Sequence, residues 1–182
     1  VVGGSAALKT LEVVNSNTAT FNSAVTTGTR VVLTDTVDAH VIAFNAGLTT
    51  PTFTVAAQPF ALTLRGNIAV ANGIHLANTG ALQLDGTLSA PNQAITLGQA
   101  GQTTTLLANT RLDSGTATTT VNGSLSGSGF TLDFASPVSF SGPSALTAST
   151  VTFSKGVTAA GDLTVNGATV VNGGSVNAGS HT

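Results

Sequence analysis

A repeat of short alternating segments between residues 60 and 98 constrains the fold of this chain most strongly. Each segment places apolar residues two positions apart and then ends at Gly, Asn or Pro, which form turns. LQLDGTL (residues 82–88) repeats LTLRGNI (residues 62–68) at a spacing of 20, and Ile74 is matched by Ile95, 21 residues further on. The alternation indicates β-strands, and a recurrence near 20 residues is typical of a solenoid with one rung per repeat.

We therefore predict an all-β fold, a single-stranded right-handed parallel β-helix (β-solenoid) with three strands per rung and about nine rungs of roughly 19–20 residues. Residues 1–182 are expected to be one segment of a longer protein, because neither end shows a polar capping element. Residues 1–59 hold less regular rungs, with an expected spacing of about 17–18. Residues 60–98 hold the clear repeat, residues 99–129 an irregular rung with an insertion, and residues 130–182 a second clear repeat.

From Phe130 onward, apolar residues recur in sets that we expect to stack in parallel ladders, because a single rung cannot bury its apolar side. Two sets recur at steps of 19: Leu132, Val151 and Val170, and Val138, Val157 and Val176. A third set, Leu146 and Leu163, has a step of 17. Phe134 and Phe153 occupy equivalent positions of neighbouring rungs and should stack inside the core.

Between residues 98 and 129 two registers remain open. Residues 101–105 resemble an insertion before Leu106, and one register then continues through Leu112, Val121 and Leu125. The rival register aligns residues 121–123 with residues 84–86. On the outer surface, Arg65 and Asp85 hold equivalent positions of adjacent rungs, which predicts an ion pair between rungs.

Asp113 and Asp133 are weak candidates for catalysis. They lie 20 residues apart, each directly after a Leu expected to face inward. If they stack, their carboxylates would lie ~5 Å apart, as in a pair that hydrolyses glycosides. The alternative is two solvated surface acids, and the sequence around them has no cluster of Arg, Lys or Tyr for an anionic sugar. We therefore assign no catalytic residue and expect that the chain is not an enzyme.

Other ligands find little support in the sequence. His40, His75 and His181 fall on different rungs, His75 facing outward, and the chain has no cysteine, so no metal site and no cofactor are predicted. Two runs of threonine, residues 103–105 and 118–120, do not recur on one face as an ice-binding array would require. Only 7% of residues are charged and the net charge is -2, which disfavours nucleic-acid partners. No apolar run is long enough to span a membrane.

Residues 62–97 and 163–179 (LTVNGATVVNGGSVNAG) resemble the β-helical passenger domains of bacterial autotransporters and filamentous haemagglutinin-like surface proteins. The low charge, the abundance of Thr, Asn and Gly, and the absence of Cys are similar in style to rickettsial-type surface antigens. The resemblance implies secretion and display on the bacterial cell surface as an adhesin or scaffold, with a host-cell or neighbouring-cell surface as partner. Two alternatives stay open: a fibre or surface-layer subunit that self-associates through the solenoid ends, and a carbohydrate-active enzyme.

Overall fold

A computed structural model describes residues 8–177, in which 19 strands and one 3-10 turn follow one another. In chain order these are β1 (Leu8–Val13), β2 (Ala19–Phe21), β3 (Val25–Leu33), η1 (Val37–Ala39), β4 (Val41–Phe44), β5 (Leu48–Thr50), β6 (Thr52–Val55), β7 (Ala61–Leu64), β8 (Asn67–Val70), β9 (Ile74–Leu76), β10 (Leu82–Ser89), β11 (Ile95–Leu97), β12 (Thr103–Asp113), β13 (Thr119–Val121), β14 (Ser124–Phe134), β15 (Val138–Phe140), β16 (Ser144–Phe153), β17 (Val157–Ala159), β18 (Leu163–Val171) and β19 (Val176–Asn177).

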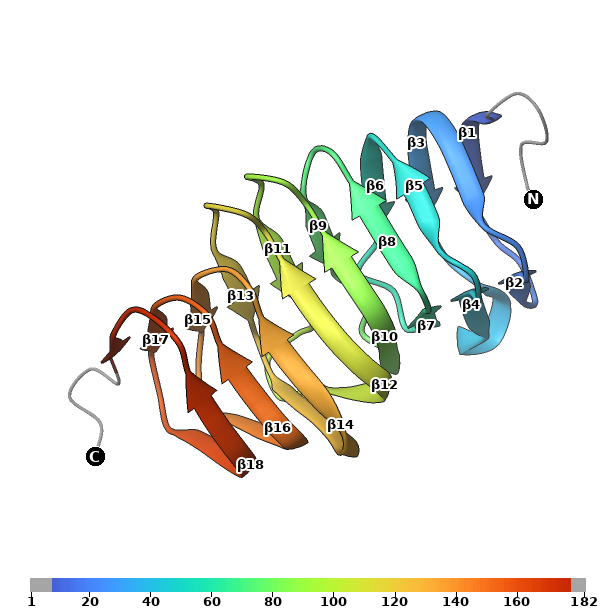
Figure 1. Cartoon of the computed structure of the whole chain (residues 1–182). Coiled ribbons are helices and arrows are strands. Elements are labelled where there is room, and N and C mark those ends of the chain that lie inside the picture. The colour runs from blue at the N-terminus through green and yellow to red at the C-terminus, as the bar shows by residue number, and fades with distance from the viewer. Residues whose placement is uncertain (1–7, 178–182) are drawn as a thin grey trace.

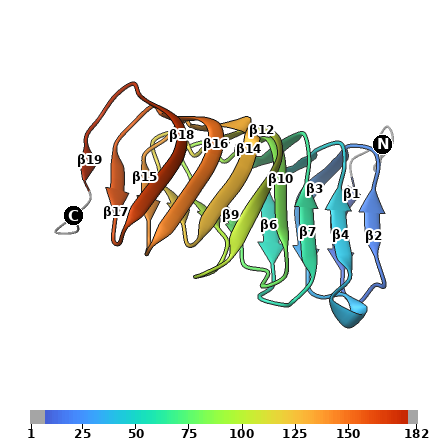
Figure 2. The ribbon, with the colours of Figure 1, turned by 90° about the horizontal axis from the view of Figure 1, so that it is seen from below.

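These strands form a parallel β-solenoid of about eight turns, close to the nine that the sequence predicts. The coils stack along one axis, with β1 and β2 at one end and β19 at the other (Figures 1 and 2). Each strand from β1 to β17 pairs in parallel with a strand one turn further along the chain. The predicted all-β architecture with almost no helix is therefore confirmed.

Three columns of strands make the three sides of each rung. The first column holds β2, β4, β7 and the first parts of β10, β12, β14, β16 and β18. The second holds the first part of β3, then β5, β8 and the later parts of the same long strands. The third holds β1, the later part of β3, and then β6, β9, β11, β13, β15, β17 and β19.

The clear repeat has the register that its sequence predicts. Leu82 pairs with Leu62, Leu88 with Ile68, and Ile95 with Ile74. Successive residues of a strand face opposite sides, so these apolar side chains point inward together, and Leu62 and Leu82 are fully buried. The core is accordingly one continuous column of aliphatic and aromatic side chains that runs the length of the stack.

Rungs near the N-terminus are longer than the sequence predicts. Ala19 pairs with Ile42 and Val25 with Leu48, so one turn of the solenoid corresponds there to a sequence separation of 23. The chain makes the 3-10 turn η1 between β3 and β4, which uses residues that a tight turn would not need. The expected spacing of about 17–18 residues is therefore wrong for these rungs.

In residues 99–129 the register through Leu112, Val121 and Leu125 is confirmed, and its rival is wrong. Val121 pairs with Leu97 in the third column, whereas Leu84 belongs to the first column and pairs with Leu106. The predicted insertion is divided between two places. Six residues, 98–103, replace the five residues 77–81 before the first column. Three residues, 107–109, replace the single residue Asp85 at the next corner.

The final rung departs from the predicted register in the first two columns. Leu132 pairs with Val151 as predicted, and the ladder of Val138, Val157 and Val176 is also confirmed. Val151, however, pairs with Thr169 and not with Val170, which is 39% exposed. Leu146 pairs with Val165, whereas Leu163 pairs with Ser144. Only residue 167 lies between the paired positions 166 and 168 of β18, where β16 has two residues, and this deletion shifts the second column by one residue.

Gly86 lies at a corner where neighbouring rungs approach closely, and this yields a stability prediction. Gly86 and Gly101 have nearly equal positive φ angles, 77° and 76°, but a Cβ atom on Gly86 would lie 2.3 Å from the backbone oxygen of Gly66, whereas a Cβ atom on Gly101 would meet no described atom within 4 Å. Gly101→Ala should therefore cost only the left-handed backbone strain, about 1–2 kcal/mol. Gly86→Ala should cost about 1–2 kcal/mol more, because the rungs must separate to admit the methyl group.

Urea denaturation of both variants measures this difference in stability, since both substitutions carry the same left-handed backbone strain. Equal midpoints for Gly86→Ala and Gly101→Ala would contradict the close approach of the two rungs at this corner.

Candidate functional site

Asp113 and Asp133, the two candidate catalytic acids, do not stack on each other. Asp133 pairs with Arg111, and Asp113 pairs with Ser89. They do not stack because β12 and β14 are paired here at a sequence separation of 22, as Leu112 with Phe134 shows, and not at a separation of 20. Arg111 and Asp113 lie two positions apart on β12, so both side chains project from the same outer face of the second column.

Arg111 joins the two acids into one charged network. Its Nη1 donates to Oδ2 of Asp133, and its Nη2 donates to Oδ2 of Asp113 at 3.3 Å. The other oxygen of Asp113 accepts hydrogen bonds from the backbone N–H of Gly115 at 3.0 Å and from the hydroxyl of Ser136 at 3.4 Å. Oδ1 of Asp133 is buried and has no hydrogen-bond donor among the described residues.

This arrangement differs from the one that glycoside hydrolysis requires. There, two carboxyl groups flank an open site, one of them protonated as the acid and the other free as base or nucleophile. Here one guanidinium binds an oxygen of each carboxylate, and the remaining oxygens are either bonded within the protein or buried. The geometry supports a structural role, in which Arg111 forms an ion pair that joins β12 to Asp133 of the next rung. The sequence did not reveal it because the extra residues at the corner before Thr110 change the spacing.

The predicted ion pair between Arg65 and Asp85 is confirmed. Nε of Arg65 lies 3.8 Å from Oδ2 of Asp85, and the other carboxylate oxygen accepts the backbone N–H of Gly66 at 2.8 Å. The arginine side chain is 47% exposed, so the charge pair itself contributes about 0–1 kcal/mol. The backbone hydrogen bond shows that Asp85 also helps to hold the turn of the preceding rung in place.

The two histidines within residues 8–177 lie on different parts of the fold. His40 directly follows η1, His75 points outward from β9, and His181 lies outside the described residues. Within residues 8–177 no three His, Cys, Asp or Glu side chains gather in a way that would hold a metal ion. Thr103 and Thr105 project from the first column and continue as Ser124 and Ser126 on the next rung.

The following rungs interrupt this hydroxyl array. Ala145 and Asn166 occupy positions in the same two outer ladders, so a regular threonine surface does not form there.

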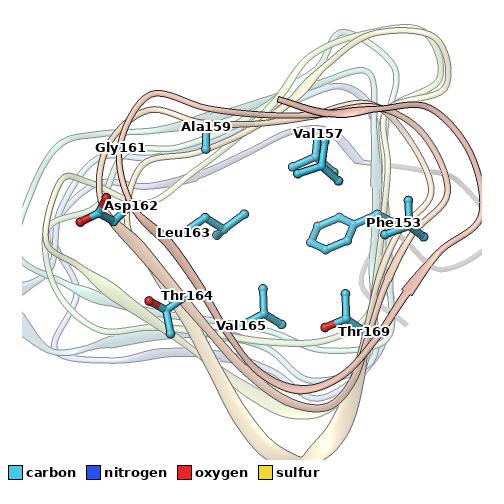
Figure 3. Close-up of a pocket in the computed structure, with 11 residues that line it drawn as sticks. Phe153, Val157, Ala159, Gly161, Asp162, Leu163, Thr164, Val165 and Thr169 are labelled. Carbon is cyan, nitrogen blue, oxygen red and sulfur yellow. The ribbon is translucent and has the colours of Figure 1, made fainter. Parts of the chain in front are cut away.

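The last described rung leaves the apolar interior accessible. A hollow of about 470 Å³ opens there, and Phe153, Leu163 and Val165 point into it (Figure 3). Val171 is 47% exposed and Val176 is 56% exposed, although equivalent positions one rung earlier, Phe153 and Val157, are buried. The residues that form a closed core elsewhere thus form an open apolar end at β18 and β19.

Comparison with known proteins returned no matching family model, no similar curated protein and no similar solved structure. In the described part of the chain, no helix has the length and apolar character needed to cross a membrane.

Proposed function

We propose that this chain is part of a secreted β-helix displayed on a bacterial cell surface, where it acts as an adhesin or a structural scaffold and not as an enzyme. The observation that carries the proposal is the architecture itself: a parallel stack with an apolar core, whose outer strand positions are mostly Thr, Ser, Asn and Gln. The resemblance of residues 62–97 and 163–179 to autotransporter passenger domains supports the extracellular location and the host-cell or neighbouring-cell partner of this proposal.

Protease treatment of intact cells of the source organism tests the location. Peptides from residues 8–177 should be released from whole cells at the same rate as from cells with permeabilised membranes. Release that requires permeabilisation would overturn surface display. An adhesive role predicts in addition that beads coated with the purified chain attach to target cells, whereas a scaffold role predicts that they do not.

A second candidate function is a subunit of a self-assembling fibre or surface layer, which a solenoid can form when strand edges of neighbouring copies pair. Within residues 8–177, β18 pairs with β16 on one side and with no strand on the other, and the exposed side chains of Val171 and Val176 lie beside this edge. Such an edge can pair with another chain. A second copy that adds its own strands there would form a heterologous contact, which propagates into a filament when it does not close.

Sedimentation over a range of concentrations tests this assembly. The chain should form larger species as its concentration rises, and Val171→Asp should abolish them by placing a charge in the apolar end. Val170→Asp is the matched control, because Val170 precedes Val171 in β18 but faces outward. A chain that sediments as a monomer throughout, or equal effects of the two variants, would contradict assembly through this end.

A further inference from the structure

A small polar hollow of about 300 Å³ lies on the outer surface where β10, β12 and β14 run side by side. It is present where two successive rungs carry extra residues at the same corner. Residues 107–109 of β12 occupy the corner that the single residue Asp85 occupies in β10. Residues 128–130 of β14 occupy the same corner, which in β16 again holds a single residue, Ser149. The hollow therefore belongs to the irregular part of the stack, and its volume is at the lower limit of small-molecule sites.

Polar side chains from all three strands line this hollow: Thr87, Asn109, Arg111, Thr131 and Asp133. Two of them are held in place by bonds within the protein. Oδ1 of Asn109 accepts the backbone N–H of Thr131 at 2.9 Å, and the Arg111 guanidinium is bound by Asp133. The amide N–H₂ group of Asn109 is exposed and has no acceptor among the described residues, so it can donate to a ligand. Groups that are already oriented lose little entropy on binding.

The charges around the hollow determine which ligands suit it. Arg111 contributes one positive charge, whereas Asp113 and Asp133 contribute two negative charges, so the local charge of this network is negative and disfavours phosphate, sulfate or carboxylate ligands. The guanidinium lies between the two carboxylates and so disfavours a metal ion. An uncharged ligand avoids both penalties. Hydroxyl groups can donate to threonine oxygens and also accept from amide and guanidinium N–H groups.

We propose that this hollow binds a neutral sugar residue of a cell-surface glycan. The proposal deepens the adhesive form of the proposed function and rests on it, since a pure scaffold would need no such site. Asn109 and Arg111 are the principal hydrogen-bond donors to the sugar, and Asp133 positions the guanidinium. No bond is made or broken in the sugar, because both acids are engaged by Arg111.

Binding of the full chain to a panel of immobilised oligosaccharides tests the proposal, with neutral hexose and N-acetylhexosamine chains in one arm and sialylated, sulfated and uronic-acid chains in the other. We expect binding in the neutral arm. Asn109→Ala and Arg111→Gln should each weaken it about tenfold or more, as the loss of one or two hydrogen bonds to a polar ligand implies.

Arg65→Gln is the matched control, because Arg65 has the same 47% side-chain exposure as Arg111 and the same kind of Asp partner but lies outside the hollow. Thermal melting of each variant shows whether it folds. Absence of binding to every neutral chain, binding in the acidic arm alone, or equal affinity of the Arg111 and Arg65 variants would overturn the proposal. Surface display is measured separately by protease release, so a displayed chain that binds no sugar overturns the hollow as a site and leaves the proposed location intact.

Discussion

Leu82→Asp should destabilise the chain by about 5 kcal/mol, the largest effect that we expect from a single substitution. Leu82 is fully buried and pairs with Leu62 on one side and Thr104 on the other, so the new carboxylate would enter the core between two rungs. The substitution removes an aliphatic side chain from the core, which alone costs about 2–5 kcal/mol, and it adds an unpaired charge that cannot be solvated there. Chemical denaturation followed by circular dichroism measures the loss.

Gln83→Asp is the control for this prediction, because it introduces the same side chain one position further along β10. Gln83 is partly exposed, and its Oε1 accepts a hydrogen bond from Thr63 Oγ1 at 3.0 Å. Loss of that bond at the surface should cost about 1 kcal/mol or less. Similar denaturation midpoints for the two variants would mean that the inward and outward faces of β10 are assigned wrongly.

Phe134→Ala should cost about 3–5 kcal/mol, the second largest effect. The ring of Phe134 is fully buried and stacks on Phe153 with centroids 5.3 Å apart and an interplanar angle of 8°. It also packs edge to face against Phe140, with ring centroids 5.9 Å apart and an interplanar angle of 79°. Truncation would leave a cavity among three rungs, and the hydrogen-bonded ladders on either side prevent the rungs from closing it. Urea denaturation at fixed temperature measures the change in stability.

Phe134→Leu separates the aromatic contribution from the filling of space, and should cost about 1–1.5 kcal/mol because most of the volume is kept. The double variant Phe134→Ala, Phe153→Ala should be less destabilised than the sum of the two single variants, by about 0.5–1.5 kcal/mol, because the stacked pair is lost only once. Strict additivity would show that the two rings do not interact, contrary to the predicted and observed stack.

The amino-acid sequence by itself determined the architecture and most of the register. Alternation of apolar and polar residues specifies which side chains face inward, because a slip of one residue would turn a whole strand inside out. Turn residues after each short strand then specify a rung of about 20 residues. These two signals suffice to align Leu62 with Leu82 and Val138 with Val157, and to place Phe134 against Phe153.

Only the tertiary structure decided the register where corners gain or lose residues. In β18 the run Thr169, Val170 and Val171 offers an apolar residue in either phase, and the pairing of Val171 with Phe153 turns Val170 outward. The extra residues at the corner of β12 likewise bring Arg111 opposite Asp133, which a constant spacing would have paired with Asp113. Corner residues contribute no alternation of their own, so their number shows its effect only when neighbouring rungs pack.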